Sequence, residues 1–320
     1  MKLKKYIALT AAVLMLGGSL TACTDKDQEN QDAYRKIGIN SMAEGDYKKA
    51  IQSFQKALDT SLGEVGPEEI DICYYKAAAQ FANGDYKDAI KTYTTLINYD
   101  KDNAEVYYLR GSVYLNQKQE EKALKDYKKA VEVGEKNYEV YIGIYENLKN
   151  SGYEDDAEEY LKKALDNKPK EAEDYAKQGY IYYLLGDYQQ AKTNLDKAID
   201  KDSKEALLYL AEVYNAEDQV EQAQGLLENY VKDNAKDSEA LNTLGMMQMN
   251  NENYEDALKY FQMGIKMKNA TNRQELMKNE IVAYEYMGDF ESAKEKMAAY
   301  LKEYKNDEEA VREYTFLKTR

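Results

Sequence analysis

Apolar and polar positions alternate along this chain in blocks that return about every 34 residues. Within a block the apolar residues are spaced three and four apart, which predicts amphipathic helices. Each block carries a marker, an alanine followed four residues later by a large apolar side chain. The marker alanines are Ala50, Ala89, Ala123, Ala157, Ala191, Ala223, Ala257 and Ala293. A period of this length predicts stacked helix pairs, because one pair alone cannot bury its apolar face.

Turn residues divide each block into two predicted helices. Glycine can take the left-handed conformation that ends a helix, and a following aspartate can cap the next one. Five blocks have the glycine, at Gly45, Gly84, Gly152, Gly186 and Gly288. Four of these glycines are followed by an aspartate, namely Asp46, Asp85, Asp187 and Asp289. The sequence therefore predicts helix–turn–helix units with a sharp turn in the middle.

Numbered by repeat position, these residues resemble the tetratricopeptide repeat. Position 4 holds a large residue at Tyr34, Tyr107, Tyr141 and Tyr175, and position 8 holds a small one at Gly38, Gly111, Gly179 and Gly245. Pro169 falls where the family often has proline. The resemblance covers residues 31–304 and is weakest in repeats four, six and eight. It implies an all-α, right-handed superhelical solenoid of about eight repeats with a C-terminal capping helix.

The N-terminus has the features of an export signal. A basic start is followed by an apolar run, Tyr6 to Leu16, that is too short to span a bilayer. The tetrad Leu20-Thr21-Ala22-Cys23 then resembles a bacterial lipobox, which implies cleavage before Cys23 and acylation (diacylglyceryl and palmitate) of its thiol. Two acyl chains on one sulfur would anchor the protein stably to the membrane. The alternative is an ordinary secretory signal with a coincidental cysteine.

These features predict four segments. Residues 1–22 form the lipoprotein signal peptide, 23–32 a flexible acidic tether, 33–304 the eight repeats and 305–320 the capping helix. The predicted location is the extracytoplasmic face of the cell membrane. Elongated repeat arrays bury little surface per residue, which agrees with the mean hydropathy of −0.81.

The charge balance restricts the partners. The chain carries 59 acidic and 44 basic residues, a net charge of −15. Removing the signal peptide, with its three lysines, makes the charge three units more negative. Such a protein repels nucleic acid and anionic headgroups, so we expect membrane contact through the lipid alone. The charge either favours basic peptides or keeps the protein soluble.

Residues that carry catalysis or bind cofactors are scarce. The chain has no histidine, which excludes Ser–His–Asp and Cys–His sites. Once Cys23 is acylated, Cys73 has no partner for a disulfide, and its repeat position predicts a buried, unreactive thiol. Residues 100–103 and 200–203 begin like calcium loops but lack the glycine and glutamate that complete such a loop. We therefore predict no enzyme activity, no cofactor and no metal site.

In tetratricopeptide arrays the first helix of each pair lines the concave face, and the resemblance implies that a peptide binds there. The implied groove residues are Tyr74, Phe81, Tyr108, Ser112, Glu146, Lys149, Tyr180, Tyr183, Asn242, Met246 and Met249. Tyrosine and methionine suit an adaptable surface. The carboxylate clamp of chaperone-binding relatives is absent, because its positions hold Arg35, Ile39, Glu105 and Leu109.

Position 2 of every repeat is acidic. These residues are Asp32, Asp71, Glu105, Glu139, Glu173, Glu205, Glu239 and Glu275. One interpretation is an acidic stripe along the groove. The other is a carboxylate in the first turn of each helix, where it interacts favourably with the helix dipole.

The leading hypothesis from the sequence is a membrane-anchored scaffold that binds proteins or extended peptides. A second is a lipoprotein that assists envelope or pilus assembly in a Gram-negative cell. A solute-binding lipoprotein would need two α/β lobes, and the chain has no runs of β-branched strand residues. A cell-wall hydrolase would need a clustered catalytic site, which the sequence does not offer.

Overall fold

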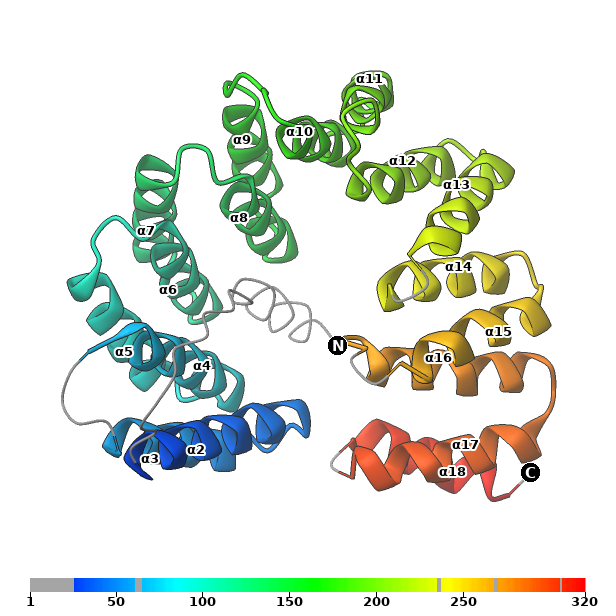
Figure 1. Cartoon of the computed structure of the whole chain (residues 1–320), viewed down its shortest axis with the longest axis horizontal. Coiled ribbons are helices and arrows are strands. Elements are labelled where there is room, and N and C mark those ends of the chain that lie inside the picture. The colour runs from blue at the N-terminus through cyan, green and yellow to red at the C-terminus, as the bar shows by residue number, and fades with distance from the viewer. Residues whose placement is uncertain (1–25, 61–64, 235–236, 268–269, 306, 320) are drawn as a thin grey trace. The chain divides into compact units, whose positions relative to one another are not determined.

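The computed structural model describes residues 26–60, 65–234, 237–267, 270–305 and 307–319, which form seventeen α-helices and no strand. The predicted all-α fold is confirmed. By packing, the chain divides into two compact units, residues 1–167 and 168–320. Both units are built from antiparallel helix pairs that follow one another along the chain (Figure 1).

The first unit contains four helix pairs. They are α2 (Lys26–Ala43) with α3 (Tyr47–Asp59), α4 (Pro67–Asn83) with α5 (Tyr86–Tyr99), α6 (Ala104–Asn116) with α7 (Glu120–Val133), and α8 (Tyr138–Asn150) with α9 (Glu154–Ala164). Each helix packs against the next along the chain, so the second helix of one pair also contacts the first helix of the following pair. The predicted stacking of repeats is present.

The second unit contains four more pairs and one closing helix. They are α10 (Ala172–Leu184) with α11 (Tyr188–Ile199), α12 (Glu205–Ala216) with α13 (Val220–Asp233), α14 (Ser238–Asn250) with α15 (Tyr254–Ile265), α16 (Arg273–Tyr286) with α17 (Phe290–Glu303), and α18 (Glu308–Leu317). Helix α18 packs against α17 as the predicted capping helix.

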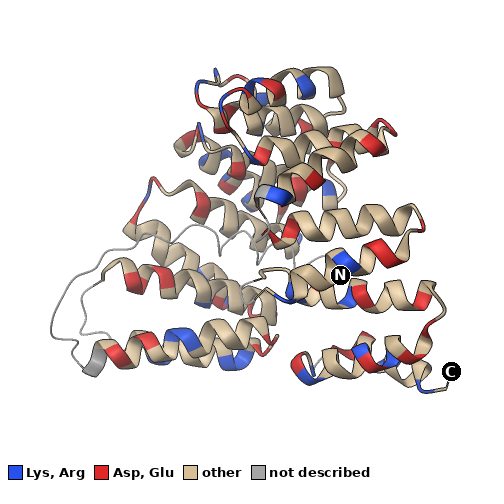
Figure 2. Ribbon diagram, turned by 45° about the vertical axis from the view of Figure 1, so that its right-hand side comes forward, with Lys and Arg blue, Asp and Glu red and all other residues tan. Residues whose placement is uncertain are grey.

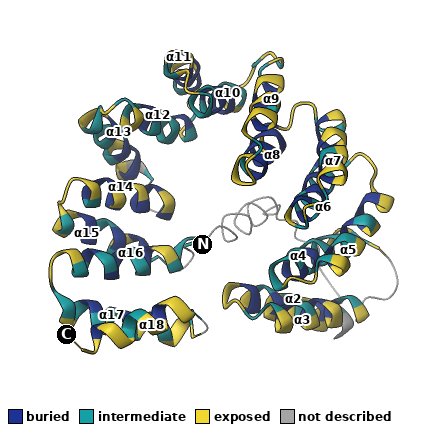
Figure 3. Cartoon of the chain, turned by 180° about the vertical axis from the view of Figure 1, so that it is seen from behind, coloured by how far each residue is buried: buried dark blue, intermediate teal, exposed yellow. Residues whose placement is uncertain are grey.

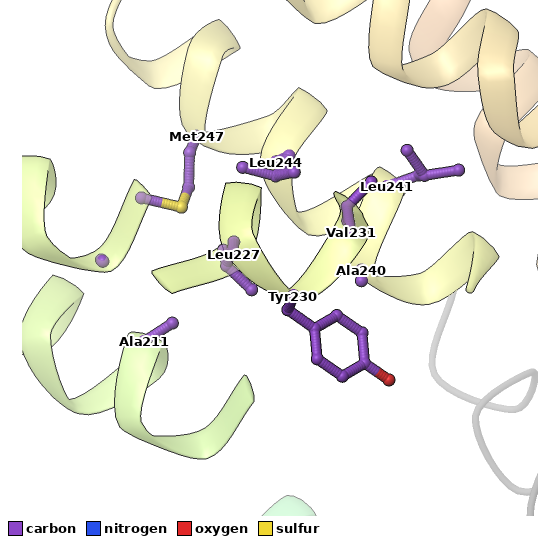
Figure 4. Packing of buried hydrophobic residues seen from close by; sticks show 9 residues of the cluster. Ala211, Leu227, Tyr230, Val231, Ala240, Leu241, Leu244 and Met247 are labelled. Atoms are coloured by element: carbon purple, nitrogen blue, oxygen red, sulfur yellow. The ribbon is translucent and has the colours of Figure 1, made fainter. Parts of the chain in front are cut away.

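The core is a chain of local clusters between neighbouring helices. Dark buried residues lie where helices face each other, and exposed residues occupy the outer surfaces and turns (Figure 3). One cluster joins α12, α13 and α14 through Ala211, Leu227 and Leu244 (Figure 4). The marker alanines at 50, 89, 123, 157, 191, 223, 257 and 293 are all fully buried. A small side chain there lets the two helices of a pair approach closely.

A left-handed residue ends the first helix in all eight repeats. The five predicted glycines have φ between 74° and 88°. In the three repeats without a glycine, Lys118, Asp218 and Glu252 take the same conformation, with φ of 58°, 59° and 61°. A side chain makes this conformation less favourable by roughly 1–2 kcal/mol. The packing of the two helices therefore imposes the turn even where the sequence disfavours it.

Tyrosine replaces the usual small residue near the end of the second helix in two repeats. The Tyr230 hydroxyl donates to Asp237 at 2.6 Å, and the Tyr300 hydroxyl donates to Asp307 at 2.6 Å. Each aspartate also caps the next helix, since Asp237 accepts from the Ala240 amide and Asp307 from the Ala310 amide. These bonds fix one repeat to the next.

The N-terminal tether is shorter than predicted, because α2 already begins at Lys26. Gln31 is buried and donates to Glu69 of α4 at 2.7 Å, and Gln28 also bonds Glu68. These contacts hold residues 26–32 in the helix, so their prediction as a flexible tether was wrong.

The predicted signal peptide, the lipobox and Cys23 lie outside the described residues. Across the described ranges, every helix is too short or too polar to serve as a bilayer-spanning segment.

A matched pair of glycines tests the close approach of helices. A Cβ at Gly179 would lie 2.6 Å from Leu195 Cγ and 3.2 Å from the Ala191 carbonyl oxygen, whereas a Cβ at Gly225 would meet no atom within 4 Å. We expect Gly179→Val to lower the free energy of unfolding by ~1–3 kcal/mol through overpacking. Gly225→Val should change it by less than about 0.5 kcal/mol. Urea unfolding followed by circular dichroism measures both. Equal midpoints for the two variants would contradict the assigned repeat register.

Candidate partner-binding surface

The first helices of neighbouring repeats touch each other directly. In the first unit α2 contacts α4 and α6 contacts α8, and in the second unit α10 contacts α12 and α14 contacts α16. Within each of these four helix pairs, the side chains of the two first helices form a shared surface. The predicted groove residues lie on these helices.

In the first unit, the predicted aromatic groove residues are partly or wholly covered. Tyr74 is half-buried, and burial together with the nearby Glu105 carboxylate raises its pKa. The Phe81 ring packs against Tyr86 of α5 at 5.9 Å. The Tyr108 ring is only 7% exposed and lies against Gly143 of α8. These side chains fill the space between repeats and support the surface from beneath.

Polar groove residues of the first unit join neighbouring helices. Ser112 accepts a hydrogen bond from Asn147 of α8 at 2.6 Å and donates to the Tyr108 carbonyl at 2.9 Å. Glu146 is half-buried on α8. Lys149 is exposed, and its ammonium donates to the Tyr145 hydroxyl at 2.8 Å. Lys149 is therefore the predicted groove residue of this unit that is most open to solvent.

In the second unit, the predicted tyrosines belong to a larger aromatic group. Tyr180 stacks on Tyr209 of α12, with ring centroids 4.4 Å apart, and on Tyr183 at 5.8 Å. Beside them, the Lys177 side chain is 8% exposed, and its ammonium donates to Glu205 at 2.7 Å and to the Tyr209 hydroxyl at 3.0 Å. The sequence analysis did not predict Tyr209 or Lys177 as surface residues. Both occupy position 6 of their repeats, one residue after position 5, which is a position that the family uses to line the concave face.

Helix α14 supplies the remaining predicted residues. Asn242 is buried, donates to Glu275 at 3.1 Å and accepts from Asn279 at 2.8 Å, so it connects α14 with α16. Met246 is 39% exposed, and Met249 is half-buried against the cluster that contains Phe261. Met246 is therefore open to a partner, whereas the side chain of Asn242 is already hydrogen-bonded to α16.

Three of the acidic residues at position 2 bond to the preceding repeat. Asp71 pairs with Arg35, Glu205 with Lys177, and Glu275 with Asn242. Others are crowded in the same way: burial raises the pKa of Glu105, and burial followed by the Glu275 charge raises that of Glu239. Neither sequence interpretation included these links between repeats. Glu205 and Glu275 lie in the first turn of their helices and also contact the preceding repeat, whereas Asp71 lies beyond the first turn of α4.

Reactive groups do not gather on this surface. Within the described residues, no group of three or more Cys, Asp or Glu side chains is arranged to hold a metal ion. Cys73 is half-buried against the core between α4 and α5, and burial raises the pKa of its thiol. The thiol is therefore protonated at neutral pH, which makes it a poor nucleophile.

Acidic side chains are spread over the helices and turns of both units, with lysine and arginine between them (Figure 2). Helix α14 is an exception, since it contains no basic residue and one acidic residue. Its exposed residues are Glu239, Thr243, Met246 and Asn250. That composition differs from α10, where Lys177 lies among tyrosines.

The stacked pairs and the shared surface of their first helices define a helical-repeat solenoid. Two sequence models of the tetratricopeptide repeat match it, one over residues 41–113 and 182–247 and the other over residues 104–137. Together the matched segments cover about half of the chain. The chain belongs to the tetratricopeptide repeat family.

The chain is also similar to several solved structures. A tetratricopeptide repeat protein from Parabacteroides merdae is 17% identical, with a TM-score of 0.47, over 79% of this chain and 99% of that one. PilF of Pseudomonas aeruginosa is 16% identical, with a TM-score of 0.41, over 68% of this chain and 98% of its own. MamA is 24% identical, with a TM-score of 0.35, over 56% and 94% of the two chains. No curated protein matched.

Proposed function

We propose that the protein is a membrane-anchored scaffold on the extracytoplasmic face of the cell membrane, where it binds proteins or extended peptides along its first helices. The tetratricopeptide fold is one that serves protein–protein interaction. The observation that supports binding here is the direct contact of first helices in neighbouring repeats, α2 with α4, α6 with α8, α10 with α12 and α14 with α16, because an extended segment can contact the two helices of such a pair together.

The chemistry of that surface suits a protein partner. The stacked rings of Tyr180 and Tyr183 and the exposed thioether of Met246 offer large, adaptable contact area. The hydroxyl groups of tyrosine add hydrogen bonds to a peptide backbone. The net charge of −15 favours a protein segment over nucleic acid or an anionic lipid surface.

The anchor is the part of the proposal that rests on the sequence alone. Cleavage at the lipobox would leave Cys23 as the first residue, and α2 begins only three residues later, at Lys26. The first repeat would then be held close to the membrane. Binding at this distance suits partners that are themselves membrane proteins or are exported past it.

Replacing Cys23 tests the anchor. We expect Cys23→Ala to abolish labelling with radioactive palmitate and to shift the protein out of the membrane fraction, because the thiol that receives the lipid is lost. Cys73→Ala is the matched control and should stay in the membrane. Fractionation, together with protease treatment of intact cells, measures attachment and sidedness. Labelled, membrane-bound Cys23→Ala protein, or a wild-type protein that intact cells protect from protease, would contradict the proposal.

A further inference from the structure

The second unit exposes an unusual group of apolar side chains where α14 and α16 end. Tyr286 is 67% exposed, Met287 40% and Met246 39%. Tyr254, the first residue of α15, stacks on Tyr286 with ring centroids 5.5 Å apart. Met249 lies one helical turn after Met246 on the same face of α14. We name these five residues the Met246–Tyr286 patch.

Met246, Tyr286 and Met287 are exposed and Met249 and Tyr254 half-buried, and all lie at or near the ends of α14 and α16, which contact each other, or on the turns that follow them. Single exposed apolar residues are ordinary, but methionines gathered with a stacked pair of tyrosines are typical of an interaction site. Methionine is flexible and polarizable, so it adapts to different apolar side chains. Tyrosine supplies a wide, rigid ring with few rotamers to lose on binding. The patch therefore fits a partner that inserts one or two aliphatic or aromatic side chains.

The two chain segments that carry the patch contain acidic residues but no basic ones. Between Lys236 and Lys259 there is no basic residue, while Glu252 and Glu255 are exposed close to Tyr254 in the chain. Between Lys278 and Lys294 there is again no basic residue, and Glu285 and Glu291 lie close to Tyr286 in the chain. Two of the flanking bases are already paired with acids, Lys259 with Asp256 at 2.7 Å and Lys278 with Asp307 at 2.7 Å.

One of these carboxyls is crowded by a second. Burial and the negative charge of Glu313 on α18 raise the pKa of Glu285 to about 7. A cationic side chain from a partner would stabilise the charged form of Glu285.

The structure assigns the Met246–Tyr286 patch as a docking site for a basic protein segment, in which one or two apolar residues are flanked by lysine or arginine. This assignment rests on the proposed scaffold function and specifies one of its partners. A second copy of the chain does not fit, because it is acidic as well. The apolar side chains supply specificity, and the acidic surroundings supply attraction that salt screens.

Designed peptides test the assignment on the full-length protein in detergent. The probe is a fluorescent peptide with a Leu-Phe pair between two Lys-Lys pairs, flanked by Gly-Ser. One control peptide has Ser-Ser in place of Leu-Phe, and a second has glutamate in place of every lysine. By fluorescence anisotropy, we expect the probe to bind roughly tenfold more tightly than either control peptide. The lysines are needed for attraction to the acidic surroundings, and the Leu-Phe pair is needed for contact with the tyrosines and methionines of the patch. An equal affinity of the Ser-Ser peptide would reduce the site to non-specific charge attraction and overturn the assignment.

Two matched double variants locate the site. Met246→Ser with Tyr286→Ser should weaken binding of the probe at least tenfold. Met263→Ser with Tyr99→Ser removes residues of similar exposure, 42% and 58%, and should leave it unchanged. Methyl NMR of the wild-type protein avoids any effect on folding: the Met246, Met249 and Met287 signals should shift, and the Met263 signal should not. Shifts confined to other methionines would refute this site but leave the scaffold function intact. The scaffold function is tested separately, by crosslinking from position 180.

Discussion

Truncating Tyr108 to alanine is expected to lower the free energy of unfolding around α6 and α8 by about 3–5 kcal/mol, the usual cost of removing a buried aromatic ring. The ring is 7% exposed, packs against Tyr127 with centroids 6.3 Å apart, and lies against Gly143 of the next repeat. Because Gly143 has no side chain, it cannot fill the space that the ring leaves. The sequence placed Tyr108 in the groove, whereas its contacts are those of a core residue.

Hydrogen exchange resolved by mass spectrometry measures this effect locally. Each repeat contacts only its neighbours, so protection should fall in α6 and α8 and remain at the wild-type level in α16 and α17. The control is Tyr99→Ala, since Tyr99 is 58% exposed at the end of α5. Its protection should match the wild type. Unchanged exchange in Tyr108→Ala would show that the ring is not part of the packing between repeats.

The repeat fold could be predicted from the sequence because its determinants are periodic. The fully buried alanines and the left-handed glycines recur at fixed spacing, so each occurrence supports the next. Local propensity alone did not predict the turns at Lys118, Asp218 and Glu252. There the helix packing on both sides overrides the preference of the residue. The repeat register, once recognised, is the signal that could have located these turns.

The start of the first helix could not be predicted, for a different reason. Residues 26–32 are polar and acidic, which by composition favours a flexible segment. Their helix is held by long-range contacts, above all by Gln31 with Glu69, 38 residues away. A sequence pattern without periodic apolar residues contains no sign of such a contact.

The candidate surface was predicted in outline but not in detail. The resemblance places the surface on the first helices, yet Asn242 and Ser112 prove to be bonded to neighbouring repeats. Conversely, Tyr286 and Tyr254 are brought together by the stacking of two repeats, across 32 residues of sequence. Which side chains are left open to solvent depends on how each repeat covers its neighbour, and this differs from repeat to repeat.

Site-specific photocrosslinking in living cells tests the scaffold function itself. A photoreactive phenylalanine analogue replaces Lys149 on α8 or Tyr180 on α10, both on first helices and outside the Met246–Tyr286 patch. The matched positions on second helices are Tyr99 on α5 and Met263 on α15, which are 58% and 42% exposed. All four variants carry the same photoreactive aromatic group at an exposed or half-buried position, so the comparison concerns the surface and not the reagent.

The measurement is the recovery of crosslinked proteins after irradiation, identified by mass spectrometry. If partners bind along the first helices, Lys149 and Tyr180 should each give discrete crosslinked products that are absent at Tyr99 and Met263. Equal recovery from all four positions, recovery from the second helices alone, or no crosslinked protein at any position would contradict the account.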